Sequence, residues 1–256
     1  MSDIGLELHA LGVSFGGFKA VDGVSLRVAE GELRVLLGAN GAGKTTLMDL
    51  ISGKTRSTEG RVELHGRDLT NWPEYRIARA GIGRKFQIPS VFRELTVRHN
   101  LCVAASREPS ILRNLRWGFG RETDRRVDEI LALAGLEEVQ QQQAGDLSHG
   151  QTQWLELGLL IAQQPKVILL DEPTAGMTAG ETRKTAQILK SLRGRHTILV
   201  VEHDMAFVRD IAERITVLHL GRVLAEGSVA EIERDARVRQ AYLGSHGISH
   251  AIGTPC

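Results

Sequence analysis

A glycine-rich loop between an apolar run and a helical pattern constrains the fold of this chain more than any other feature. The loop reads Gly38-Ala39-Asn40-Gly41-Ala42-Gly43-Lys44-Thr45-Thr46 and fits the pattern G-x-x-x-x-G-K-[ST]. Apolar residues 33–37 precede it, and residues 44–52 have the apolar spacing of a helix. Strand, loop and helix in this order are the context that a phosphate-binding loop requires.

The chemistry of this loop is the recognition of a phosphate chain. Glycines let backbone N–H groups converge on phosphate oxygens, and the helix N-terminus that follows favours an anion. We expect Lys44 to reach the β- and γ-phosphates and Thr45 to ligate Mg²⁺. A glycine-rich turn with a surface lysine is the alternative, but the flanking patterns argue against it. The predicted nucleotide-binding residues of the loop are Gly38, Asn40, Gly41, Ala42, Gly43, Lys44, Thr45 and Thr46.

Two carboxylates end a second apolar run, residues 167–170. An acid at the end of such a strand lies close to the phosphates of a bound nucleotide, so we expect Asp171 to hold Mg²⁺. Glu172 is expected on the other side of the strand, where it would orient or deprotonate the attacking water. Two solvated acids before a turn at Pro173 are the alternative, which the phosphate-binding loop makes weaker. Together the two motifs predict a P-loop NTPase without specifying its kind.

Composition excludes several classes of function. The 32 Lys and Arg residues nearly balance the 31 Asp and Glu residues, so no broad field attracts nucleic acid, and we expect no nucleic-acid partner. Cys102 and Cys256 lack the spacing of a metal site or disulfide framework, which fits a reduced cytosolic compartment. No apolar run approaches the about 20 residues of a membrane span, and the first ten residues lack the apolar core of a secretory signal.

Periodicity divides the chain into an α/β core and a helical lobe. Residues 6–13 and 24–28 are predicted to be antiparallel strands. Residues 97–105, 123–134 and 150–163 have helical patterns.

A strand–helix–strand rhythm follows, which implies parallel pairing. Its strands are residues 167–170 and 197–201, separated by a helix over residues 179–192. We therefore predict a single domain over residues 1–244, with a core of residues 1–93 and 166–244 and a helical lobe of about residues 94–165. Residues 245–256 are predicted to be a flexible C-terminal tail.

The segment Leu147-Ser148-His149-Gly150-Gln151 resembles the LSGGQ signature of ABC ATPases. This resemblance covers nearly the whole chain and implies their fold, a mixed-sheet core with an N-terminal antiparallel β subdomain and an inserted helical lobe. It also implies that Ser148, Gly150 and Gln151 contact the γ-phosphate of an ATP bound to the loop of an opposing subunit, at the N-terminus of a helix. Two chains would then sandwich two ATP molecules.

Other family markers follow in the expected order. Phe15 resembles the aromatic residue that stacks on adenine, although Phe18 is close enough to compete. Gln87 resembles the Q-loop glutamine that senses Mg²⁺ and the lytic water, and His203 resembles the switch histidine that contacts the γ-phosphate. The resemblance therefore makes Glu172, His203 and Gln87 the catalytic residues, with Thr45, Gln87 and Asp171 around the metal.

Two stretches depart from the family pattern. His149 replaces the first glycine of the signature, which could narrow the allowed backbone angles. The D-loop is Ala175-Gly176-Met177-Thr178 rather than Ser-Ala-Leu-Asp. A degenerate signature can mark an inactive half-site, but Ser148, Glu172 and His203 are all present, so we expect an active ATPase.

Several segments are similar to the branched-chain amino acid importer class: residues 81–87, 94–97, 175–177, 201–205 and 238–244. Within that class, residues 83–87, 147–151, 153–156 and 217–219 are most similar to the larger ATPase of the urea importer. The alternatives are a branched-chain amino acid importer, an exporter ATPase or a soluble ABC ATPase. The last usually carries two cassettes or a long coiled coil, and neither is present here.

The resemblance implies a set of partners at the cytoplasmic face of a bacterial inner membrane. A second ABC ATPase subunit would complete a hetero- or homodimer beneath two integral membrane permeases. An extracytoplasmic solute-binding protein would deliver the solute, so this chain would not touch it. Residues 88–92, which are apolar and contain a proline, are either part of the permease-docking surface or buried core.

Overall fold

The computed structural model describes residues 3–85, 91–106 and 120–243, and the chain divides into two compact units. The first unit comprises Met1–Arg84, Lys166–Pro173 and Leu189–Cys256, and the second comprises Lys85–Pro165 and Thr174–Ile188. Gln87 and the predicted tail of residues 245–256 lie outside the described residues.

An antiparallel sheet forms the N-terminal part of the first unit. Its strands run in the order β2 (Phe18–Ala29), β1 (Ile4–Phe15), β4 (Glu59–Leu64) and β5 (Arg67–Asp68). The hairpin between β1 and β2 turns at Gly16 and Gly17, whose φ angles of 56° and 89° suit a two-residue turn that favours glycine. The predicted antiparallel strands are confirmed, although both are longer than their apolar runs indicated.

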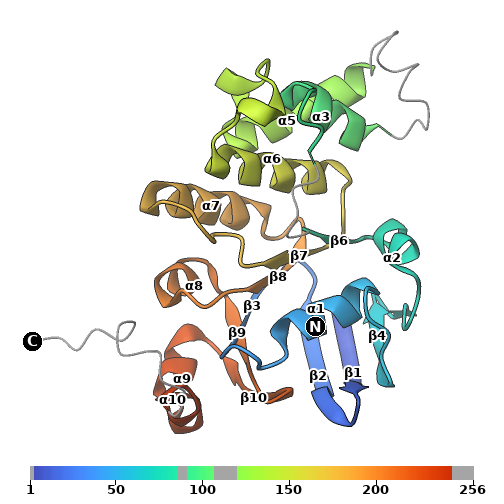
Figure 1. Ribbon diagram of the computed structural model, residues 1–256, viewed down its shortest axis with the longest axis vertical. Helices are drawn as coiled ribbons and strands as arrows, with labels where there is room; N and C mark the ends of the chain where they lie inside the picture. Colours follow the sequence, from blue (N-terminus) through green and yellow to red (C-terminus); the bar gives the residue numbers. More distant parts are fainter. Residues whose placement is uncertain (1–2, 86–90, 107–119, 244–256) are drawn as a thin grey trace, which may run out of the picture. The chain divides into compact units, whose positions relative to one another are not determined.

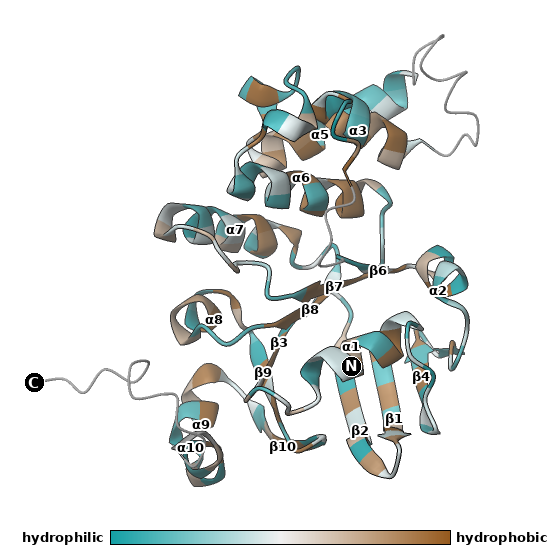
Figure 2. Ribbon diagram, in the orientation of Figure 1, coloured by the Kyte–Doolittle hydropathy of each residue, from teal (hydrophilic) through white to brown (hydrophobic). Residues whose placement is uncertain are grey.

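A mixed sheet of six strands forms the rest of the core. Its order is β10 (Arg222–Gly227), β9 (Arg214–His219), β3 (Leu33–Gly38), β8 (Thr197–Val201), β7 (Val167–Asp171) and β6 (Ile82–Arg84), as Figure 1 labels them. All neighbours are parallel except β10 and β9. The inner strands β7 and β8 are buried and appear brown in Figure 2, as expected for parallel strands covered on both faces.

The register of the mixed sheet brings the two sequence motifs to one edge. Leu36 of β3 and Asp171 of β7 both pair with Val201 of the strand between them. The phosphate-binding loop follows β3 and Glu172 follows β7, so both leave the sheet at its carboxyl edge. This edge is where open α/β sheets bind their ligands.

Helices of the first unit complete its core. They are α1 (Lys44–Ser52), α2 (Glu74–Ala80), α8 (Met205–Ile211), α9 (Val229–Arg234) and α10 (Ala236–Leu243). Leu47, Met48 and Ile51 of α1 join one apolar cluster with residues of both sheets. Burial of this face, rather than intrinsic propensity, stabilises so short a helix. Among the described residues, the helices fall short of the length and hydropathy needed to cross a membrane.

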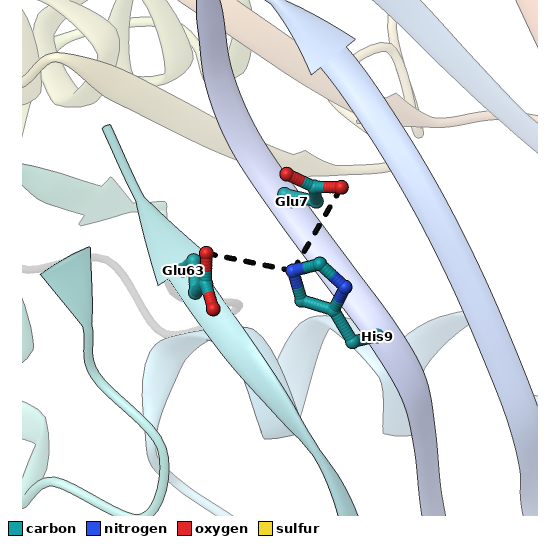
Figure 3. A group of neighbouring side chains, drawn as sticks. All are labelled: Glu7, His9 and Glu63. Carbon is teal, nitrogen blue, oxygen red and sulfur yellow. Dashed lines mark ion pairs between the residues drawn. The ribbon is translucent and has the colours of Figure 1, made fainter. Parts of the chain in front are cut away.

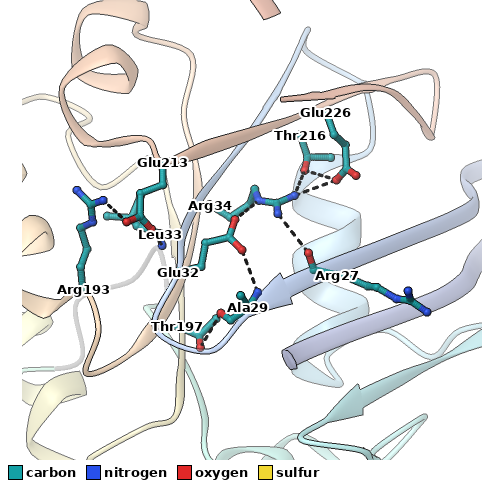
Figure 4. Close-up of polar contacts among 10 residues, drawn as sticks. All are labelled: Arg27, Ala29, Glu32, Leu33, Arg34, Arg193, Thr197, Glu213, Thr216 and Glu226. Carbon is teal, nitrogen blue, oxygen red and sulfur yellow. Dashed lines mark hydrogen bonds and ion pairs between the residues drawn. The ribbon is translucent and has the colours of Figure 1, made fainter. Parts of the chain in front are cut away.

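A buried arginine ties four strands of the first unit together (Figure 4). The side chain of Arg34 is 3% exposed and its Nε donates to Glu32 Oε1 at 2.6 Å. Its Nη1 donates to Thr216 Oγ1 and Glu226 Oε1, both at 2.9 Å, and its Nη2 donates to the carbonyl of Arg27 at 3.2 Å. Because hydrogen bonds satisfy all three guanidinium nitrogens, they offset the free-energy cost of burying this charge.

The second unit is helical. It contains α3 (Val97–Ala105), α5 (Arg121–Ala134) and α6 (His149–Ala162), with short 3₁₀ turns at Glu137–Val139 and Ala144–Asp146. Most of α7 (Ala179–Leu192) also belongs to it. Trp154 Nε1 of α6 donates to Thr185 Oγ1 of α7 at 3.0 Å, and Lys184 Nζ lies 3.7 Å from the centre of the Trp154 ring. The sequence-based division left residues 174–188 in the core, whereas these contacts group Thr174–Ile188 with the helices.

Candidate nucleotide-binding site

Glycines shape the loop between β3 and α1. Gly43 has φ of 99°, and a β-carbon there would lie 2.5 Å from the carbonyl oxygen of Ala20. A β-carbon on Gly38 would lie 2.6 Å from the carbonyl oxygen of Leu218. Only glycine fits these positions without displacing backbone, so the loop is held close to the backbone of its neighbours.

The loop opens onto a cavity of about 400 Å³ in the first unit. Phe18 lines this cavity and Phe15 does not, although both side chains are exposed. Phe18 is therefore the better placed of the two competing aromatic residues to stack on a base. The lining residues are Phe18, Ala20, Asn40, Gly41, Ala42, Gly43, Lys44, Thr45, Thr46 and Glu172.

Lys44 is a buried cation inside the loop. Its Nζ donates to the carbonyl oxygens of Gly38 at 2.7 Å and Ala39 at 3.1 Å. Burial lowers the pKa of Lys44, while the nearby carboxylates of Glu172 and Asp171 oppose that shift. An ammonium held in so little water interacts strongly with an anion that enters the cavity.

Asp171 ends β7 as a buried carboxylate. Its Oδ2 has no hydrogen-bond partner among the described residues, and the nearest cationic atom is Arg84 Nη2 at 3.8 Å. Burial raises the pKa of Asp171; Arg84 and a hydrogen bond from Thr45 lower it, and the Glu172 charge raises it further. Mg²⁺ prefers oxygen ligands, so an orphaned carboxylate oxygen beside a threonine hydroxyl fits such a cation.

Glu172 turns away from the strand into the cavity. Its φ of 47° is left-handed, which is uncommon for a residue other than glycine. Its N–H donates to the carbonyl of Val201 at 2.9 Å, and its Oε1 lies 3.3 Å from His203 Nδ1. The side chains of Glu172 and His203 are 42% and 66% exposed, so water reaches both. The sequence-predicted base and switch histidine are thus neighbours.

The signature segment begins α6 in the second unit. Ser148 Oγ accepts from the N–H of Gln151 at 3.3 Å, and Gln151 Oε1 accepts from the N–H of Ser148 at 2.9 Å. This capping box fixes the serine at the helix start. The sequence analysis missed it, although the Ser-x-x-Gln spacing carries the signal. A β-carbon on Gly150 would lie 2.1 Å from Glu181 Oε1, so a larger residue there would displace the Glu181 carboxylate.

Arg84 is a site neighbour that the sequence analysis did not single out. It contacts Asp171 and also bonds Asp49 Oδ1 at 2.5 Å and Ser52 Oγ at 3.0 Å. It therefore holds a positive charge beside the acid at the end of β7. Its position three residues before Gln87 was a usable signal, but pairing it with Asp171 requires the β6–β7 register.

A second group of titratable side chains lies on the antiparallel sheet (Figure 3). Glu7, His9 and Glu63 have ligand-type atoms within 4.8 Å of one another, and His9 Nε2 lies between the two carboxylates. Arg27 and Arg61 already pair with these carboxylates. Each carboxylate of the cluster therefore already has an arginine partner.

Comparison with known proteins places this fold and site in a family. A model of the ABC transporter family matches residues 21–175, and a model described as the branched-chain amino acid ATP-binding cassette transporter matches residues 222–248. The chain is 38% identical over 255 residues to the high-affinity branched-chain amino acid transport ATP-binding protein LivG of Salmonella typhimurium, covering 95% of this chain and 99% of that protein. It is 36% identical over 248 residues to BraF of Pseudomonas aeruginosa, covering 93% and 97%.

Solved structures of ABC transporter ATPases have the same fold. MJ1267, an ATP-binding cassette of an ABC transporter, superposes with a TM-score of 0.81 at 31% identity, covering 94% of this chain and 99% of that one. Its ADP conformation gives a TM-score of 0.80, covering the same shares.

The chain therefore belongs to the ABC transporter family, as an ATPase whose ATP hydrolysis is coupled to transport. Within that family it is an importer ATP-binding subunit of the LivG and BraF type. The predicted ABC ATPase fold is confirmed. The names of these relatives match the branched-chain amino acid alternative better than the urea importer.

Proposed function

We propose that this chain hydrolyses ATP in a branched-chain amino acid importer, at the cytoplasmic face of the membrane. The cavity that joins Lys44, Thr45 and Glu172 supports the ATPase chemistry. The near full-length similarity to LivG and BraF, with the family match at residues 222–248, supports the choice of solute. In this proposal a second ATPase subunit, identical or different, and two permeases complete the transporter, and a solute-binding protein supplies it.

The first unit would carry the bond-breaking step. The ammonium of Lys44 would bind the β- and γ-phosphates, and Phe18 would stack on the base. When bound, Mg²⁺ would neutralise phosphate charge, and Thr45 and Asp171 would hold it. Glu172 would take a proton from the attacking water as the water oxygen bonds to the γ-phosphorus and ADP leaves. His203, 3.3 Å from that carboxylate, would orient it and contact the γ-phosphate.

The second unit would complete a site on another subunit. Ser148 and the first N–H groups of α6, near Gly150 and Gln151, form a helix N-terminus suited to an anion. We assign them to the γ-phosphate of ATP bound by the opposing ATPase. Gln87 would contact the metal and the water in its own site, but it lies outside the described residues. Binding of two ATP molecules would thus close the dimer.

The permeases would contact the second unit near residues 91–92. A cavity of about 580 Å³ is lined there by Val91, Phe92, Arg93, Glu94, Leu95 and Val103. Phe92 is 55% exposed, which supports a docking surface rather than buried core for this end of the apolar segment; Ile88, Pro89 and Ser90 lie outside the described residues. A phenyl ring left in water favours coverage by another apolar surface.

Isolation of the complete transporter tests this function. The tagged chain is purified from native membranes with ATP, beside a matched Glu172→Gln variant, and its co-purifying proteins are identified. The complex is then placed in proteoliposomes with its binding protein, and ATP-driven uptake of labelled leucine and of labelled urea is measured.

Each outcome has a distinct meaning. Leucine uptake that Glu172→Gln abolishes supports the proposal. Urea uptake without leucine uptake would replace the solute but leave the ATPase assignment intact. Recovery of exporter or ribosomal proteins in place of permeases would overturn the transport assignment.

A further inference from the structure

The signature segment and the D-loop are in contact at His149 and Gly176, two of the positions that depart from the family pattern. His149 stands where the signature has a glycine, and Gly176 stands where the D-loop pattern has an alanine. Both belong to the second unit.

The imidazole of His149 reaches the D-loop backbone. His149 Nε2 lies 3.2 Å from the carbonyl oxygen of Ala175. A carbonyl oxygen can only accept, so this contact is a hydrogen bond when Nε2 carries the proton. His149 is the first residue of α6, directly after the capped Ser148. The ring is thus anchored at the point where the signature serine is fixed.

Gly176 makes room for this ring. It has φ of 74°, and a β-carbon there would lie 3.2 Å from His149 Nε2, closer than carbon and nitrogen atoms normally pack. An alanine would strain the backbone and press on the imidazole. Histidine in the signature and glycine in the D-loop therefore form a matched pair, in which each departure compensates the other.

A second contact joins the same two segments. The carboxylate of Glu181, in the first turn of α7, accepts from the N–H and hydroxyl of Thr178, both at 2.8 Å. Its Oε1 packs against Gly150, where a β-carbon would lie 2.1 Å from it. The D-loop is thus held at Ala175 by the side chain of His149 and at Thr178 through Glu181. Both contacts lead to adjacent residues of the signature.

We propose that His149 is a positioning residue that locks the D-loop to the signature segment, so that the two move as one piece. This inference rests on the proposed function, in which Ser148 binds the ATP of the opposing subunit. The D-loop follows Glu172 after Pro173 and Thr174. The lock therefore connects the base of one ATP site to the serine that completes the other.

Two substitutions at one position separate this role from simple packing. His149→Gln keeps an N–H donor near the place of Nε2, whereas His149→Phe keeps a ring and loses the donor. In the complete transporter, His149→Phe should lower kcat by about two- to twelvefold, which corresponds to one neutral hydrogen bond. KM for ATP should not change, because the lock acts after ATP reaches the loop at Lys44. His149→Gln should restore kcat to near the wild-type value.

A double-mutant cycle tests the matched pair. Gly176→Ala should lower kcat in the wild-type background and lower it less in a His149→Gly background, where no ring meets the new methyl group. Additive effects of the two substitutions would refute the pairing. Thermal melts of each variant give the folded fraction to which kcat is normalised.

The failure of this inference is distinguishable from failure of the proposed function. If His149→Phe equals the wild type in kcat, or lowers only the melting temperature, His149 is structural and the lock is refuted. If the wild-type complex itself shows no ATP-driven uptake, the proposed function fails. Loss of kcat in His149→Phe with rescue by His149→Gln supports the lock.

Discussion

Neutralising Asp171 should stabilise the chain while removing its metal-dependent activity. The carboxylate is buried, its Oδ2 lacks a hydrogen bond among the described residues, and Arg84 is 3.8 Å away. Asp171→Asn keeps the size and an acceptor for the Thr45 hydroxyl but removes the charge. Arg84 keeps its bonds to Asp49 and Ser52, so the substitution leaves no cation stranded.

The expected gain in the free energy of unfolding equals the cost of the unsatisfied buried polar group that the substitution removes, about 1–3 kcal/mol. For a chain of this size each kcal/mol corresponds to about 2–4 °C in melting temperature, so we expect a rise of about 2–12 °C at pH 7. The sign depends on pH. Because folding raises the pKa of Asp171, the stability it contributes is present below about pH 3.9 and is lost as the pH rises through the folded-state pKa. The advantage of Asp171→Asn should therefore grow as the pH rises toward 7.

The assay is a series of thermal melts without nucleotide across this pH range, paired with ATPase rates in Mg²⁺. In the proposed mechanism Asp171 holds Mg²⁺, and loss of such a ligand would remove several kcal/mol of charge stabilisation, so the Mg²⁺-dependent rate should fall by at least about 100-fold. Asp49→Asn is the matched control: it removes a carboxylate that Arg84 already pairs with, and should lower the melting temperature. A lower melting temperature for Asp171→Asn at pH 7, or an unchanged dependence on Mg²⁺, would refute the reasoning.

Three further substitutions probe the site and the core. Glu172→Gln should lower kcat by about 10²- to 10⁴-fold with little change in ATP binding, as measured by steady-state kinetics; near-normal turnover would mean that another residue is the base. Phe18→Ala should raise KM for ATP about fivefold, which corresponds to the low end of the free energy of base–aromatic stacking. An equal rise in KM for Phe15→Ala would contradict the assignment of Phe18 as the residue that stacks on the base. Arg34→Ala should cost about 3–5 kcal/mol in urea unfolding because it leaves the largely buried Glu32 carboxylate and the buried Thr216 hydroxyl without their partner. The exposed Arg27→Ala should cost about 1 kcal/mol or less, and equal losses would count against the buried network.

Local sequence signals predicted much of the fold. The predicted bounds of α1, α3, α7 and β8 coincide with those observed, because caps or glycines end their apolar patterns. Thr96 caps α3 and Gly53 ends α1. The three-residue β6 and the antiparallel pair β9–β10 were missed, since β6 is too short to show a period and the burial of β9 and β10 does not alternate strictly. Their identity depends on the neighbours they pair with.

The site was predictable where one segment carries the chemistry. The loop of Gly38 to Thr46 supplies most of the residues that line the cavity. The positions of Asp171 and Glu172 were predicted from the single apolar run that precedes them. The choice of Phe18 over Phe15 depends on how the β1–β2 hairpin lies beside the loop, which no local pattern reveals. The contact of His149 with Ala175 joins segments 26 residues apart, so tertiary structure alone exposes it.

The division of the chain into its two units limits how this protein can be cut or recombined. The polypeptide passes between the units after Arg84, Pro165, Pro173 and Ile188, and the third passage comes one residue after Glu172. A chimera that borrows the helices of a relative would need four junctions, and an exchange of residues 85–165 alone would pair a foreign α6 with the native α7. Such a transplant would put the native Thr185 hydroxyl opposite a foreign partner in place of Trp154 Nε1, so the two segments need to be exchanged together.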